Sequence, residues 1–254
     1  MGDAEMSVAL DTSTRPPARV AHSPFFARMA LVTLGLVILS FPLAYYIPVI
    51  TGSRRWPPLV HIHGLFFFSW ICLYAWQTRL ASTGRVSLHR EFGLAGIAIS
   101  AIMVPLGVGV VIIQARMNLA RGMTDPYWLT FMNLMGITTF AGLMTASIAS
   151  VTRHREWHRR FTYGAALILL QFAASRLFQM FSASPQLAYF ILLVPDLVFL
   201  GALVAHDRKA LGRVHPATVW MTAILLPLHA VATPISHSHA WASIAPFVLH
   251  LTGR

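Results

Sequence analysis

The 254-residue sequence is poor in charged side chains and in cysteine. Only 11% of its residues are charged and 8 are acidic, whereas 56% are hydrophobic. Soluble domains carry about 25% charged residues, so this composition excludes an ordinary soluble protein. The single cysteine, Cys72, excludes an intramolecular disulfide, and its place in an apolar run predicts a buried thiol.

Several sequence signatures of catalysis are also missing. The chain has no G-x-S-x-G elbow, no P-loop and no dinucleotide fingerprint. Membrane di-iron enzymes need several histidine boxes, including HxxHH. Here only one HxxxH, at 154–158, and two HxH pairs, at 61–63 and 237–239, occur. The histidine pattern also differs from that of the seven-helix zinc hydrolases. The sequence therefore favours no particular reaction.

Long apolar runs are the main feature that is present. Charge-free runs such as 29–53, 56–78, 92–115 and 126–152 exceed the roughly 20 residues that a helix needs to cross the hydrocarbon layer. We therefore predict an all-α integral membrane bundle of seven transmembrane helices within residues 25–236. The expected ranges are 28–49, 57–78, 92–114, 127–151, 161–182, 186–205 and 216–235.

The two ends of the chain differ from this domain. Residues 1–24 show no hydrophobic periodicity and are expected to form a disordered cytoplasmic tail. The first apolar run is too long for a signal peptide and should stay as a helix. Residues 237–254 form the last segment. Its apolar part, 241–251, is too short to span and should be interfacial or re-entrant.

Basic residues predict the orientation, because cytoplasmic loops keep Lys and Arg during insertion. With the N-terminus inside, thirteen Lys and Arg lie in cytoplasmic segments and five on the other side. This favours a cytoplasmic N-terminus in a bacterial inner membrane. It also attributes the net charge of +11 to topology and to anionic lipid headgroups as partners, not to nucleic acid.

Two charged residues, Arg176 and Asp196, fall inside predicted spans. A charge at mid-bilayer costs about 2.5–3.5 kcal/mol on insertion scales, so it usually has a partner or a function. The two residues lie on neighbouring antiparallel helices, which can bring them together. Both a structural ion pair and a role in ligand contact fit the sequence.

Polar and small side chains repeat at helical spacing on several spans. The stripe on 57–78 contains His63, Phe67, Trp70, Tyr74 and Gln77, and that on 161–182 contains Gln171, Ser175 and Gln179 beside Arg176. The stripe on 216–235 starts at His215 and includes His229. Thr138, Gly142, Thr145 and Ala149 form a stripe of small residues on 127–151, which predicts tight helix packing.

If these stripes converge, they enclose an intramembrane pocket in the outer half of the bundle. At about 1.5 Å per residue, His63, Asn133, Arg176 and His229 lie about 7–10 Å from their helix ends. The predicted site comprises His63, Trp70, Tyr74, Gln77, Asn133, Gln171, Arg176, Gln179, Asp196 and His229.

Three functions fit such a site. The first is binding of a small hydrophobic ligand or cofactor. The second is a redox role, with quinone or a b-type haem held by His63 and His229, because two histidines at matching depth supply axial ligation. The third is a structural or assembly subunit without catalytic activity.

Histidines also gather at the cytoplasmic side. His154 and His158 have the i, i+4 spacing of metal ligands on one helical face. Both lie in a run dense in arginine, where positive charge would repel a cation. We therefore expect these two side chains to contact lipid headgroups.

An ordered series of motifs extends over about residues 59–220. It contains His63-Gly64, Trp70, Gln77, Leu80, Gly84, Leu88-His89-Arg90, Gly93, His158-Arg159-Arg160, Arg176, Asp207 and Gly212-Arg213-Val214-His215-Pro216-Ala217-Thr218. In this series the chain resembles a family of uncharacterised bacterial polytopic membrane proteins. The resemblance implies a membrane fold of several helices and no settled activity.

The resemblance also marks a group of residues at the cytoplasmic face. These are His89, Arg90, His158, Arg159, Asp207, Arg213 and His215. The chain departs from the family pattern at His206, where an aromatic residue is expected. Further departures are the additional histidines at 61, 154, 229, 237 and 239.

Overall fold

The computed structural model describes residues 24–53, 55–181 and 185–250, and all regular structure in these ranges is helical. The elements are α1 (Phe25–Ser40), the π-helical segment η1 (Pro42–Tyr46), α2 (Ile47–Ile50), α3 (Pro58–Ser82), α4 (Val86–Ala120), α5 (Trp128–Ser150), α6 (Arg155–Phe181), α7 (Pro185–Leu211), α8 (Pro216–Ser236) and α9 (His239–His250). The predicted all-α class is confirmed for these residues.

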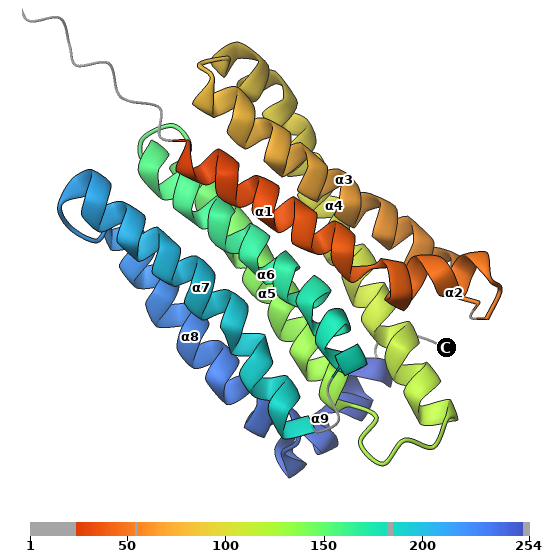
Figure 1. The fold of residues 1–254 in the computed structure, drawn as a ribbon. Helices are drawn as coiled ribbons and strands as arrows, with labels where there is room; N and C mark the ends of the chain where they lie inside the picture. Colours follow the sequence, from red (N-terminus) through yellow and green to blue (C-terminus); the bar gives the residue numbers. More distant parts are fainter. Residues whose placement is uncertain (1–23, 54, 182–184, 251–254) are drawn as a thin grey trace, which may run out of the picture.

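The long helices run up and down in one bundle. Figure 1 shows α7 and α8 along one side and α3 and α4 along the other, with α1, α5 and α6 between them. The turns α3–α4, α5–α6 and α7–α8 lie at one end, together with the start of α1. We call this the basic end, because most of the described Lys and Arg residues are here. The opposite end carries α2, the α4–α5 connection and α9.

Four helices are long and apolar enough to cross a membrane: α3, α4, α5 and α8, with 25, 35, 23 and 21 residues. A helix satisfies all its backbone hydrogen bonds internally, as a lipid environment demands. Large apolar side chains point outward, including Leu65, Leu94 and Leu197, which are 66%, 71% and 59% exposed. These features indicate a membrane protein. Cys72 is also exposed, so the predicted buried thiol is wrong.

The first predicted span, 28–49, is not one regular helix. The α-helix ends at Ser40, and Pro42, which has no N–H to donate, begins the π-helical segment η1. Backbone N–H groups of Tyr45 and Tyr46 both reach the carbonyl of Phe41, at 2.8 and 3.2 Å. The wider helical turn places both tyrosines on the wall of a cavity described below.

Four other helices extend beyond their predicted bounds at the basic end, and the first of them, α3, ends at Ser82 instead of 78. α4 begins at Val86 instead of 92, α6 begins at Arg155 instead of 161, and α7 ends at Leu211 instead of 205. Charged residues ended the spans predicted from hydropathy, but they do not end a helix. Consequently His89, His158 and Asp207 are all carried on helical turns.

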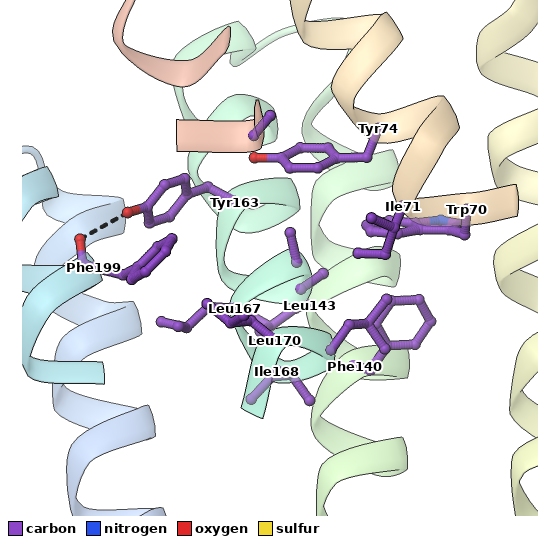
Figure 2. Packing of buried hydrophobic residues seen from close by; sticks show 14 of the residues in the cluster. Trp70, Ile71, Tyr74, Phe140, Leu143, Tyr163, Leu167, Ile168, Leu170 and Phe199 are labelled. Carbon is purple, nitrogen blue, oxygen red and sulfur yellow. Dashed lines mark hydrogen bonds between the residues drawn. The ribbon is translucent and has the colours of Figure 1, made fainter. Parts of the chain in front are cut away.

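Aromatic side chains fill the centre of the bundle (Figure 2). Trp70 and Tyr74 of α3 stack with ring centroids 5.6 Å apart, and Trp70 meets Phe140 of α5 edge-on at 5.3 Å. The hydroxyl of Tyr163 on α6 donates to the carbonyl of Phe199 on α7, at 2.8 Å. In a bilayer such van der Waals packing and interhelical hydrogen bonds hold helices together, since lipid is as apolar as leucine.

Close helix approach occurs at glycines other than the predicted one. Gly142 and its stripe partners Thr138, Thr145 and Ala149 are exposed, so the predicted packing seam is wrong. A Cβ atom placed on Gly136 would instead lie 2.4 Å from the Phe172 ring of α6. The spacing of the small residues was regular, but the stripe lies on the face of α5 that turns away from its neighbours.

We predict that Gly136→Ala destabilises the bundle, because the added methyl forces the Phe172 ring or α6 to move. Overpacking of this kind costs about 1–3 kcal/mol. Gly142→Ala is the matched control on the same helix, since a Cβ there meets nothing within 4 Å. Thermal unfolding in nanodiscs would compare the two variants, and equal midpoints would contradict the expected α5–α6 contact.

Candidate functional site

A cavity of about 930 Å³ lies at the end of the bundle opposite to the basic end. Its wall comes from the α1–α2 segment and from α3, α4, α5 and α6. We call it the main cavity. Much of the wall is aromatic, with Phe41, Tyr45, Tyr46, Phe67, Phe140 and Phe172 among the lining residues. No Asp or Glu belongs to the described lining.

Arg176 brings a positive charge to this wall. Its Nη1 donates to the backbone carbonyl of Phe172 on the same helix, and its guanidinium carbon lies 4.8 Å from the centre of the Phe41 ring. Among the described residues no carboxylate lies within 4.0 Å of it. The main cavity is therefore electropositive, with Arg176 as the lining residue that keeps a permanent charge.

Histidines of α3 add further polar groups to the same wall. The Nδ1 atom of His63 is buried and has no hydrogen-bond partner among the described residues. His61 lies nearer the helix end, where its Nδ1 forms a short hydrogen bond with the hydroxyl of Tyr45. Both histidines line the main cavity, so the α1–α2 segment and α3 meet through polar contacts at its edge.

Asn133 and Gln114 form the polar part of the wall from α4 and α5. The Asn133 amide donates to Oε1 of Gln114, at 3.1 Å. Asn133 and Phe172 also line a second, small cavity of about 80 Å³, together with Gln171 and His229. These two shared residues separate the cavities. The small cavity has room for about two or three waters, at about 30 Å³ each.

The predicted proximity of Arg176 and Asp196 is wrong, because Asp196 is paired with a histidine. Oδ2 of Asp196 accepts from Nδ1 of His229 at 2.5 Å, and Nε2 of Gln171 lies 3.1 Å from the same nitrogen. Asp196 is fully buried. Arg176 is held by the carbonyl of Phe172 on its own helix and by the ring of Phe41, which lies between α1 and η1, whereas the carboxylate of Asp196 on α7 pairs with α8.

The structure therefore divides the predicted site. His63, Asn133 and Arg176 come together at the main cavity, while Gln171, Asp196 and His229 form a separate cluster between α6, α7 and α8. Trp70, Tyr74 and Gln77 are buried and line neither cavity.

Trp70 and Tyr74 pack in the core (Figure 2). Gln77 lies against His89, towards the basic end. The side chain of Gln179 lies outside the described residues.

A second charged network is buried at the basic end. Arg160 of α6 has no exposed surface and donates to both carboxylate oxygens of Asp207 on α7. Asp207 also accepts from the hydroxyl of Thr218 on α8 and from the backbone N–H of His215. Glu156 receives a further donor of Arg160 at 2.5 Å. Arg160, with its charge balanced by carboxylates, thus ties three helices together.

The other motif residues surround this network. His158 points inward, with its Nδ1 2.8 Å from the hydroxyl of Ser147, so the predicted headgroup contact is wrong for it. His89 faces the His158 ring at 6.4 Å. Arg159 pairs with Glu156 at 3.2 Å, whereas Arg90, Arg213 and His154 are exposed.

His215 begins α8. Its Nδ1 accepts from the backbone N–H of Ala217, and the following Pro216 suits the first helical turn, where no N–H is needed.

Comparison of the chain with protein-family models, with curated proteins and with solved structures finds no match. The geometry therefore carries the functional reasoning. The structure explains part of the motif series physically, because Arg160, Asp207, His215 and Thr218 come from distant motifs and meet in one network.

Sequence reasoning missed two features. Arg160 was predicted only as part of a basic motif and not as a buried charge, although its spacing of four residues from Glu156 is a signal for an intrahelical pair. Gln114 was missed because it lies near the end of a long apolar span. The described residues contain no group of three or more His, Cys, Asp or Glu side chains placed to hold a metal ion.

We predict that Asp207→Asn lowers stability by about 3 kcal/mol or more, since the buried charge of Arg160 loses its buried carboxylate partner and keeps only the partly exposed Glu156. Glu156→Gln is the control: its carboxylate is 41% exposed, and exposed ion pairs contribute about 0–1 kcal/mol. Unfolding in detergent or nanodiscs measures both. A smaller effect at Asp207 than at Glu156 would show that the buried network is not the stronger tie.

The capping histidine gives a pH prediction. Burial, followed by the charge of Arg160, lowers the pKa of His215 below its ordinary value of 6.5. The folded protein therefore prefers the neutral ring, and the contribution of His215 to stability falls as the pH drops below about 6.5. His215→Asn keeps a capping oxygen that does not titrate. The variant should lose less stability than the native protein between neutral and acidic pH, and identical pH profiles would contradict this.

Proposed function

We propose that this protein is a multi-pass membrane protein that binds a small amphipathic ligand in the main cavity. The observation that carries the proposal is a cavity of about 930 Å³ with aromatic walls, into which a few polar groups from different helices converge. Ligand sites usually combine a volume of about 300–1,000 Å³ with mostly apolar walls and a small number of placed polar groups.

The polar groups have the arrangement that recognition requires. His63, Asn133 and Arg176 come from α3, α5 and α6, so a ligand that contacts all three would sit between helices. The buried Nδ1 of His63 has no protein partner among the described residues, and a buried polar atom of this kind favours an added partner. A purely structural bundle would gain by filling such a volume with side chains.

The proposal includes a topology. Seven crossings, with the N-terminus in the cytoplasm of a bacterial cell, place the basic end inside and the main cavity in the outer half of the inner membrane. The separation of charge supports this: the described basic residues gather at the end that holds Arg79, Arg85 and Arg90.

Quinone binding is the second candidate, because a quinone offers carbonyl acceptors to donors such as Arg176 between aromatic walls. The b-type haem expected between His63 and His229 has less support. His63 lines the main cavity and His229 lines the small one, with Asn133 and Phe172 between them.

We predict that Gly64→Phe blocks ligand binding. Gly64 lines the main cavity, and a Cβ atom there meets nothing within 4 Å, so the cavity wall has room for an added ring without a clash at its first atom. Decylubiquinone and single-chain amphiphiles in phosphatidylcholine nanodiscs serve as probes. A bound probe at a hundred times its Kd stabilises the protein by about 2.7 kcal/mol, which a thermal scan detects.

Gly142→Phe is the matched control, because it adds the same ring on the exposed face of α5, where there is also open space. We expect the control to keep the stabilisation and Gly64→Phe to lose it. If no probe stabilises the native protein, or if both variants respond as the native protein does, the cavity is not the binding site. A structural or assembly role without a ligand would then be favoured.

A further inference from the structure

We infer that the ligand of the main cavity is a single-chain amphiphile with an anionic oxygen head, bound by Arg176. This inference rests on the proposed function and names the class of ligand. The head is a carboxylate or a phosphate monoester, since both present charged oxygens to a guanidinium.

The first step is the charge of the cavity wall. Arg176 is ionised at any physiological pH, and the described lining contains no Asp or Glu. A cation in a low-dielectric environment is strongly unfavourable without a counter-charge. The protein provides counter-charges elsewhere: Arg160, on the same helix, has Asp207 and Glu156 within hydrogen-bond distance. At Arg176 the compensation is left to another molecule.

The second step is the state of the guanidinium. One donor of Arg176 is used by the carbonyl of Phe172, and one face rests on Phe41. These contacts hold the group in place on the cavity wall without neutralising it. A cation–π contact contributes about 0.5–2 kcal/mol. It does not replace the counter-charge that an ion pair would provide. The other N–H groups have no acceptor among the described residues, so they are available to a ligand head.

The third step is the shape and lining of the remaining space. His63 and Asn133 add polar atoms near the head position, and the aromatic wall with Met103 and Ile137 suits an apolar tail. The volume lies within the range for drug-sized ligands, about 300–1,000 Å³, which favours one chain over a two-chain lipid. A neutral quinone would accept hydrogen bonds but would leave the charge of Arg176 uncompensated.

The experiment compares probes of equal chain length. Dodecanoate, dodecyl phosphate and dodecanol are titrated into the protein in phosphatidylcholine nanodiscs, at mildly alkaline pH where the carboxylate is ionised. Thermal stabilisation and a direct binding isotherm give Kd. We expect an anionic probe to bind at least about tenfold more tightly than dodecanol, as for a charged hydrogen bond. The anion that binds more tightly identifies the head.

Variants of Arg176 test the contact itself. Arg176→Gln should weaken binding of the anion about ten- to a hundredfold and affect dodecanol much less, so the preference for the anion is lost, whereas Arg176→Lys should keep part of the preference. Arg116→Gln removes a charge from α4 outside the cavity lining and should change nothing. A folded Arg176→Gln protein that still prefers the anion would overturn the inference.

The outcomes separate this inference from the proposed function. If dodecanol or decylubiquinone binds as tightly as the anions, and Gly64→Phe abolishes that binding, the cavity is a ligand site for neutral molecules and the anionic head is wrong. If no probe binds to the folded native protein, both the anionic head and the ligand-binding role are overturned.

Discussion

The guanidinium of Arg160 is buried where α6, α7 and α8 meet, and its charge is balanced there by Asp207 and Glu156. A fully buried arginine is tolerated only when its donors find acceptors and its charge finds an opposite charge. Asp207 meets this demand and at the same time accepts from Thr218 and from the backbone that starts α8. The order of the last three long helices at the basic end depends on this network.

The same helix carries Arg176 four to five turns further along, at about 24 Å for a rise of 1.5 Å per residue. Its surroundings are opposite in kind. Aromatic rings and a backbone carbonyl hold it, and no carboxylate among the described residues balances it. Arg160 thus ties helices together, and Arg176 lies open to a cavity. The presence or absence of a balancing carboxylate therefore distinguishes the structural part of α6 from the part that lines the candidate site.

The cluster of Asp196, His229 and Gln171 joins helices, as Arg160 does, and also borders a cavity, as Arg176 does. Asp196 is fully buried, and the hydrogen bonds of the cluster link α7 to α8 and α6. Pro195 precedes the aspartate, and Pro227 lies two residues before the histidine, so both helices lack a backbone donor close to the pair. The cluster borders the small cavity, which shares Asn133 and Phe172 with the main one. It therefore supports the wall behind the candidate site.

The amino-acid sequence by itself determined the helical class, the presence of helices long and apolar enough to cross a membrane (α3, α4, α5 and α8), and the separation of basic residues to one end. These properties follow from hydropathy and charge, which are local. It also pointed to His63, Asn133 and Arg176, because polar groups in apolar runs are conspicuous and their depth follows from the rise per residue.

Only the tertiary structure decided which of these groups meet. Rotation of each helix about its axis sends Asp196 to His229 instead of Arg176, and turns Gly142 outward while Gly136 packs on Phe172. Extension of α6 and α7 past their hydropathy limits carries Arg160 and Asp207 into contact. Rotation and extension result from packing between helices distant in sequence, so no single apolar run contains this information.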